Sequence, residues 1–132
     1  MKFTYDKERC ADFASDILNA DKIWGSWFQC IGVERNGELV AVAVFNDYTG
    51  YNVEITVASR GPWALRGVIR RAMYYAFTEL GCKRITAHIR PSNARAISAA
   101  TRVGFMQEGR ARKWFGNEDA IILGLLTDEV KV

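Results

Sequence analysis

Apolar residues recur with the period of one helix face along residues 62–80, the longest regular pattern in the chain. The repeating positions are Leu65, Val68, Ile69, Ala72, Met73, Ala76, Phe77 and Leu80. Pro62 suits the first turn of a helix, because its missing N–H would have no helical partner there. Gly81 suits the residue that follows a helix. The pattern therefore predicts a helix over residues 62–80.

Two further helices are predicted, over residues 6–19 and between Asn93 and Gly104. The first has an apolar face made by Ala11, Phe13, Ala14, Ile17 and Leu18. In the second, Asn93 is a favourable N-cap and Gly104 stands where a glycine commonly ends a helix. Pro91 cannot donate to a sheet, so it ends the strand that precedes this helix.

Short apolar or alternating runs predict strands over residues 28–34, 38–45, 53–58, 85–90, 105–114 and 120–126. Asn36-Gly37 joins the first two strands and is a strong hairpin signal. Turns are predicted at residues 47–50 and at Gly116-Asn117, and an irregular aromatic turn at residues 22–27. The order of elements is a helix, three antiparallel strands, a helix, a strand, a helix and two strands. This order predicts a mixed α/β sheet with helices on its faces.

Composition narrows the class of protein. The length of 132 residues fits one domain, residues 1–132, and 49% hydrophobic residues suffice for one core. No apolar run approaches the ~20 residues of a membrane span, and the N-terminus lacks the order of a secretory signal. We therefore expect a soluble, cytoplasmic protein. Cys10, Cys30 and Cys82 form no Cys-x-x-Cys pair, which predicts buried free thiols and neither a metal site nor a redox motif.

A net charge of +3 and a pI near 8.9 suit an anionic small molecule, such as a nucleotide-like ligand. The excess of positive charge is too small for a typical nucleic-acid-binding stripe, so nucleic acid is an unexpected partner.

The stretch ITAHIRPSNARAISAATRVGFMQEG, residues 85–109, resembles the second half of a GNAT-superfamily N-acetyltransferase. The resemblance rests on Asn93 opening a helix and Gly104-Phe105 closing it. Glu108-Gly109, with Arg112 three residues on, is similar to the ribosomal-protein N-terminal (alanine or serine) acetyltransferases, the closest type. The resemblance implies the GNAT fold over about residues 28–126, acetyl-CoA as the acetyl donor, an amine acceptor and a homodimer.

In the family, the loop that opens the long helix has the form (Gln/Arg)-x-x-Gly-x-(Gly/Ala) and holds the pyrophosphate of the cofactor on free amides of the helix start. In this chain the pattern falls on Pro62, Leu65 and Gly67, of which only Gly67 fits, so the pyrophosphate loop is atypical. Arg66 can compensate and Trp63 can stack on the adenine.

Arg60, Arg70 and Arg71 crowd the same region, and Arg66 and Arg70 share a helix face. The alternative is that these arginines form a solvated helix face and that Trp63 packs into the core.

The resemblance also implies that the strand over residues 53–58 parts from the strand that begins at Ile85. The pantetheine arm of the cofactor would lie in the gap, bonded to main-chain groups near Val57 and Ser59. Asn93 would lie near this arm in addition to capping its helix.

His88 is the only histidine in the chain, and histidine titrates in the range that a general base for an amine needs. It stands five residues before Asn93, where the ribosomal-protein type carries a glutamate base. Glu54 is a second candidate base, because it lies on the strand before the cofactor loop, from which some members of the superfamily take a carboxylate base. With a period of two it shares one strand face with Thr56 and Ala58. The alternatives are a histidine packed within the sheet and an exposed glutamate.

No general acid stands at the expected position. Many relatives carry a tyrosine seven residues after the capping asparagine, and this chain has Ala100 there. Tyr48 and Tyr51 are possible substitutes.

The sequence thus predicts an N-acetyltransferase that acts on a primary amine of a protein N-terminus, a polyamine or a small molecule. We expect the specificity for the acceptor to depend on Trp24, Trp27 and the turns near Tyr48 and Trp114. One alternative is an inactive acyl-CoA-binding or protein-interaction domain of the same fold. Another is a nucleic-acid-binding module built on the arginines of residues 60–71 with Trp63, Tyr74 and Tyr75.

Overall fold

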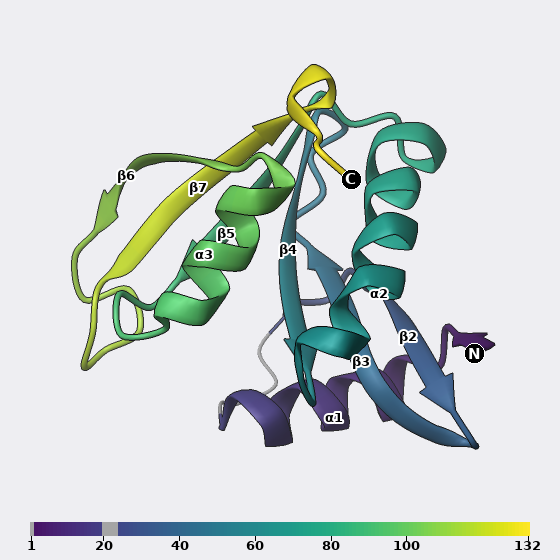
Figure 1. Cartoon of the computed structure of the whole chain (residues 1–132). Coiled ribbons are helices and arrows are strands. Elements are labelled where there is room, and N and C mark those ends of the chain that lie inside the picture. Colours follow the sequence, from purple (N-terminus) through teal and green to yellow (C-terminus); the bar gives the residue numbers. More distant parts are fainter. Residues whose placement is uncertain (1, 20–23) are drawn as a thin grey trace.

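One seven-stranded sheet forms the centre of the molecule, with strand order β1-β2-β3-β4-β5-β7-β6 (Figure 1). The computed structural model of the chain describes residues 2–19 and 24–132. Every neighbouring pair of strands is antiparallel except β4 and β5, which are parallel. This is the mixed, mostly antiparallel sheet that the sequence predicts, and it confirms the predicted fold class.

The strands are β1 (Lys2–Thr4), β2 (Phe28–Arg35), β3 (Glu38–Asn46), β4 (Asn52–Ser59), β5 (Arg84–Ile89), β6 (Met106–Ala111) and β7 (Ala120–Leu126). The α-helices are α1 (Lys7–Leu18), α2 (Pro62–Tyr74) and α3 (Ala94–Val103). A π-helical turn, η1 (Tyr75–Glu79), continues α2, and a 3₁₀ turn, η2 (Thr127–Glu129), follows β7. None of the helices in the described ranges has the length and apolar content that a bilayer span requires.

Most predicted elements lie within two residues of their observed bounds, two differ from the prediction, and one observed strand, β1, was not predicted. β1 has only three residues, too few for a hydrophobic period, and forms by pairing with β2. β6 ends at Ala111 instead of Trp114, because Lys113 adopts a φ of 55° that no strand permits. The last turn of the predicted long helix is π-helical. Residues 22 and 23 of the predicted aromatic turn lie outside the described residues.

Helices cover both faces of the sheet, because β3 is buried on both sides and needs apolar partners above and below. On one face, Cys10, Phe13 and Ala14 of α1 pack on Cys30, Val42, Val44 and Ala58. On the other face, α2 and α3 pack on strand residues that include Val53, Ile55, Ile85, Leu123 and Leu125. The three cysteines are buried free thiols, as predicted.

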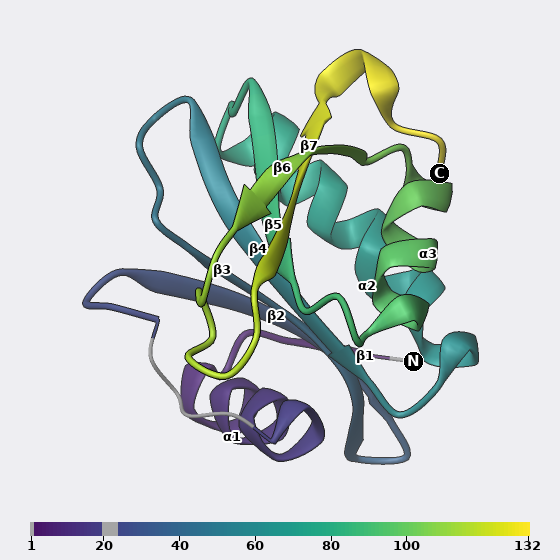
Figure 2. The same ribbon diagram turned by 90° about the vertical axis from the view of Figure 1, so that its left-hand side faces the viewer.

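The face that carries α1 is only partly covered. α1 packs against β2, β3 and β4. Viewed from the β6 edge, α1 lies on one side of the sheet and α2 and α3 lie on the other (Figure 2). In the described chain no helix stands over β5, β7 and β6 on the α1 side (Figure 2). Polar side chains of β4 and β5 therefore face solvent or one another there.

The end of α3 depends on a glycine. Gly104 has a φ of 123° and donates its N–H to the carbonyls of Ala100 and Thr101. The chain after β7 passes directly over it, so that a Cβ on Gly104 would lie 2.1 Å from the carbonyl oxygen of Glu129. The Gly104-Phe105 step is therefore required by both backbone conformation and space.

We expect Gly104→Ala to destabilise the protein by about 3 kcal/mol, since it adds a backbone clash to an unfavourable φ. Gly81→Ala is the matched control, because Gly81 has a φ of 70° but open space around its Cα. The control should cost only about 1 kcal/mol. Urea unfolding of both variants measures the difference, and equal losses would contradict the close approach at Gly104.

Candidate active site

The sheet divides between β4 and β5. These parallel strands pair only over Asn52–Arg84, Val53–Ile85 and Glu54–Thr86. β4 then continues along β3 to Ser59, and β5 continues along β7 to Ile89, so the two strands move apart (Figure 1). This confirms the divergence that the family resemblance implied. Beyond Glu54, no strand of the described residues pairs with β4 on its β5 side.

Both α2 and α3 begin at the wide end of this division, as Figure 1 shows. The N-cap of α2 is Gly61, which offers no side chain to the helix amides, and Pro62 follows it. A helix start of this kind carries partial positive charge and outward N–H groups. The N-terminus of α2 is therefore suited to bind an anion.

A pocket of about 330 Å³ lies along the first two turns of α2, lined by Trp63, Arg66, Gly67 and Arg70. Three of these residues are predicted cofactor contacts, and the structure brings them together on one face. The Trp63 indole lies against the backbone of Gly61, since a Cβ there would be 2.8 Å from Nε1. Trp63 is thus exposed on the surface and is not part of the core.

The remaining predicted residues of this region lie elsewhere. Arg60 donates to the carbonyl of Leu39 and stacks over Phe13, and Arg71 pairs with Glu79 and Tyr5. Of the four arginines expected to cluster here, only Arg66 and Arg70 line the pocket. The side chain of Leu65 is half-buried and does not line the pocket.

His88 and Glu54, predicted as alternative bases, contact each other. Nδ1 of His88 forms a short hydrogen bond with Oε1 of Glu54, and each side chain is only 14% exposed. Both residues lie on the α1 face of the sheet at the point where β4 and β5 part. With Glu54 ionised, Nδ1–H donates to the carboxylate, and Nε2 carries the free lone pair.

Burial raises the pKa of the Glu54 carboxyl above its usual value of 4.5, and the His88 contact acts in the opposite direction. The Asp47 carboxyl adds a further increase to the pKa of Glu54. Asp47 reaches this position from the turn after β3, where its φ is 52°. As a net result, ionisation of Glu54 is less favourable in the folded chain than in water.

Trp114 covers the imidazole of His88. The two rings are parallel within 5°, and their centroids are 4.3 Å apart. Trp114 belongs to the loop between β6 and β7, which is anchored by Arg90 over the ring of Phe115. The same loop supplies Glu118, which accepts hydrogen bonds from the N–H and hydroxyl of Ser92. Sequence reasoning missed this anchoring, because no local pattern links residues 114–118 to residues 88–92.

The structure also places the other candidates. Asn93 caps α3 through a hydrogen bond from the N–H of Ala96 at 3.2 Å, as predicted. Ala100 packs against the core, and Tyr48 donates its hydroxyl to the carbonyl of Leu80. Trp27 stacks on Tyr48 with centroids 5.4 Å apart, at the start of β2.

The chain matches the Acetyltransferase (GNAT) family over residues 3–105 and belongs to that family. SpeG spermidine/spermine N-acetyltransferase from Vibrio cholerae in complex with manganese ions has a TM-score of 0.77 and 18% identity, covering 96% of this chain and 92% of that chain. A dodecameric structure of spermidine N-acetyltransferase from that organism has a TM-score of 0.77 and 17% identity, with coverage of 96% and 94%.

A point mutant of the same Vibrio cholerae enzyme has a TM-score of 0.79 and 18% identity, with coverage of 97% and 96%. At these identities the likeness shows the fold alone. No curated protein sequence matches the chain. The similarities do not distinguish the ribosomal-protein type from other members of the family.

We expect Glu54→Gln to raise the thermal midpoint at about pH 8. Because the folded protein raises the pKa of Glu54, ionisation of this carboxyl costs folding free energy, and the neutral amide avoids that cost. The stabilisation should shrink as the pH falls and disappear below the usual pKa, where Glu54 is protonated in both states. Differential scanning calorimetry at several pH values measures the effect. Glu38→Gln, at an exposed position of β3, is the control and should show no such trend.

Proposed function

We propose that this protein is an N-acetyltransferase that moves the acetyl group of acetyl-CoA to a primary amine. The observation that carries the proposal is the partly buried His88–Glu54 pair at the point where β4 and β5 part, in a chain of the GNAT family. The fold supports an acyl-CoA donor, and the pair supports removal of a proton from an amine.

The donor would bind across the division of the sheet. The amides at the start of α2 and the guanidinium groups of Arg66 and Arg70 suit the phosphates of acetyl-CoA, and Trp63 offers a face to its adenine. We assign Leu65 and Gly67 to this contact through their backbone. Main-chain groups of Val57 and Ser59, and the side chain of Asn93, would hold the pantetheine arm.

His88 would act as the base. The amine nitrogen attacks the thioester carbonyl, and its N–H proton passes to Nε2 of His88. The bond between carbon and sulfur breaks, and the thiolate of coenzyme A takes up a proton from solvent or from His88. Glu54 holds Nδ1–H and so fixes the ring with Nε2 free, while Trp114 fixes its plane.

The acceptor would enter on the α1 face, beside Trp114, Asp47 and the stacked pair of Trp27 and Tyr48. Carboxylates and aromatic rings together suit the cation of an amine before it loses its proton. The resemblance to ribosomal-protein N-terminal acetyltransferases favours a peptide N-terminus. The spermidine N-acetyltransferases of similar fold make a polyamine the second acceptor to test.

An inactive acyl-CoA-binding domain is a second candidate, favoured by two observations. Ala100 packs where relatives carry a tyrosine acid, and the hydroxyl of Tyr48 is already bonded to Leu80. Orientation of the reactants alone contributes ~7 kcal/mol or more to such reactions, whereas an acid or base adds about two to four powers of ten. The missing tyrosine therefore reduces the expected rate and leaves the reaction possible.

Two measurements test the proposal. Acetyl-CoA at about 100 times its Kd should raise the thermal midpoint by several degrees, since it binds only the folded chain. Release of free thiol is then followed over a panel of peptide N-termini, polyamines and small amines. A thermal shift without thiol release from any amine would favour the binding domain. No shift with acetyl-CoA would exclude both candidates.

We expect His88→Ala and Arg66→Ala to affect different kinetic constants. His88→Ala should lower kcat by about two to three powers of ten, with little change in the affinity for acetyl-CoA, because it removes the base. Arg66→Ala should raise the KM for acetyl-CoA about tenfold with kcat nearly unchanged, because it removes a phosphate contact. Steady-state thiol-release kinetics measure both constants.

Arg102→Ala, at an exposed position in the last turn of α3, is the matched control for loss of an arginine and should behave as wild type. Kinetics of His88→Ala equal to those of the wild type would remove His88 from the mechanism.

A further inference from the structure

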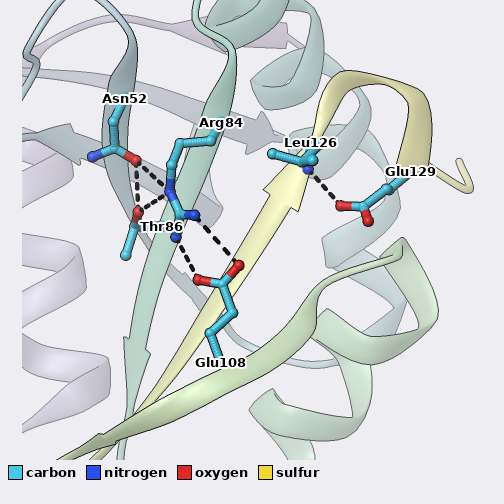
Figure 3. Close-up of polar contacts among 6 residues, drawn as sticks. All are labelled: Asn52, Arg84, Thr86, Glu108, Leu126 and Glu129. Carbon is cyan, nitrogen blue, oxygen red and sulfur yellow. Dashed lines mark hydrogen bonds and ion pairs between the residues drawn. The ribbon is translucent and has the colours of Figure 1, made fainter.

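A polar cluster joins strands β4, β5 and β6 at the closed end of the sheet division (Figure 3). Arg84 of β5 donates through Nε to Oδ1 of Asn52 on β4 at 3.2 Å and to Oγ1 of Thr86 at 3.0 Å. Thr86 in turn donates to Asn52 at 2.6 Å. The two Nη atoms of Arg84 donate to the two carboxylate oxygens of Glu108 on β6, at 2.8 and 3.3 Å. We call these four residues the Arg84 cluster.

Two irregular positions make the contact between Arg84 and Glu108 possible. The register of β6 against β7 shifts between Gln107 and Gly109, so Glu108 is the extra residue of a β-bulge, a feature that redirects a side chain. β7 lies between the two partners and presents Gly124 there, without a side chain. A Cβ on Gly124 would lie 2.4 Å from Oε2 of Glu108 and 2.7 Å from Nη2 of Arg84.

The position of the cluster gives it a role beyond the ion pair. Asn52, Arg84 and Thr86 are three of the six residues through which β4 and β5 pair. Glu54 is the pairing partner of Thr86, and His88 is two residues further along β5 on the same face. Through Glu108 the cluster also holds β6, whose following loop carries Trp114.

We propose that the Arg84 cluster is a positioning device that fixes where β4 and β5 part, and thereby holds Glu54 and Trp114 in place on His88. The catalytic consequence rests on the proposed function, whereas the geometric consequence does not. Arg84 and Glu108 are positioning residues, because they act on His88 through the strands.

A purely stabilising role is the competing explanation. The Arg84 and Glu108 side chains are 31% and 41% exposed, and ion pairs at such exposure contribute little to the stability of a fold. A change in the orientation of the reacting groups, by contrast, has a large effect on rate. A positioning role therefore predicts a loss of kcat that is large compared with the loss of stability.

Glu108→Gln is the main test variant, because it keeps the shape of the side chain and removes the charge. Gly124→Ala is the second, since its added methyl group displaces the ion pair sterically. Glu34→Gln is the matched control: it removes the same charge and breaks the 2.6 Å ion pair between Glu34 of β2 and Arg9 of α1, away from the cluster and from the loop that carries Trp114. All three are compared as full-length chains, first by thermal unfolding.

The readout that does not depend on activity is the Cε1–H signal of His88 in proton–carbon NMR spectra. His88 is the only histidine, so the signal needs no further assignment, and the Trp114 ring stacked on it makes its chemical shift sensitive to their geometry. Steady-state kinetics supply kcat and the KM for acetyl-CoA.

We expect Glu108→Gln to move the His88 signal beyond its line width and to lower kcat about tenfold, with the KM for acetyl-CoA within about twofold of wild type. Glu34→Gln should leave all three quantities unchanged. Arg84→Lys, which keeps the charge but not the fork of donors, should fall between Glu108→Gln and wild type.

An unmoved His88 signal in folded Glu108→Gln would overturn the proposal, and so would an equal shift in the Glu34→Gln control. If Gly124→Ala does not fold, Glu108→Gln alone decides. If the wild-type protein transfers no acetyl group, the NMR comparison still tests the positioning of His88, and only the proposed function fails.

Discussion

The short pairing between β4 and β5 is the constraint on which the rest of the structure depends. A parallel pair needs a crossover connection, here α2, and each strand also has an antiparallel neighbour that carries it onward. Because the pairing stops at Glu54 and Thr86, the sheet opens on the side where α2 and α3 begin. Unpaired main-chain groups along the free side of β4 then suit a ligand that carries amide groups of its own. The pantetheine arm of acetyl-CoA is such a ligand.

The division also separates two kinds of chemistry. Positive charge gathers on α2, at Arg66 and Arg70, whereas the carboxylates of Glu54 and Asp47 lie on the opposite face of the sheet with His88. An anionic donor and a cationic acceptor would therefore approach from different sides and meet where β4 and β5 part.

Long-range contacts hold this geometry in place. The loop between β6 and β7 reaches back to Ser92 through Glu118 and lays Trp114 on His88. The Arg84 cluster ties β6 to β5 and β4 across Gly124. The Glu108-Gly109 step, noted in the sequence only as a family likeness, is thus the bulge that turns a carboxylate toward Arg84. These contacts give an exposed edge strand, β6, a definite position relative to His88.

The sequence by itself determined the local elements and the family. The cap at Asn93, the Asn36-Gly37 hairpin and the glycine after α3 each depend on a few adjacent residues, so their positions follow from residue type. Tertiary structure decided what depends on strand register and crossing: that His88 meets Glu54 from 34 residues away, that Arg60 and Arg71 turn from the α2 pocket, and that Glu108 reaches Arg84. No local pattern encodes these pairings, because a register shift of one residue moves every side chain to the other face of the sheet.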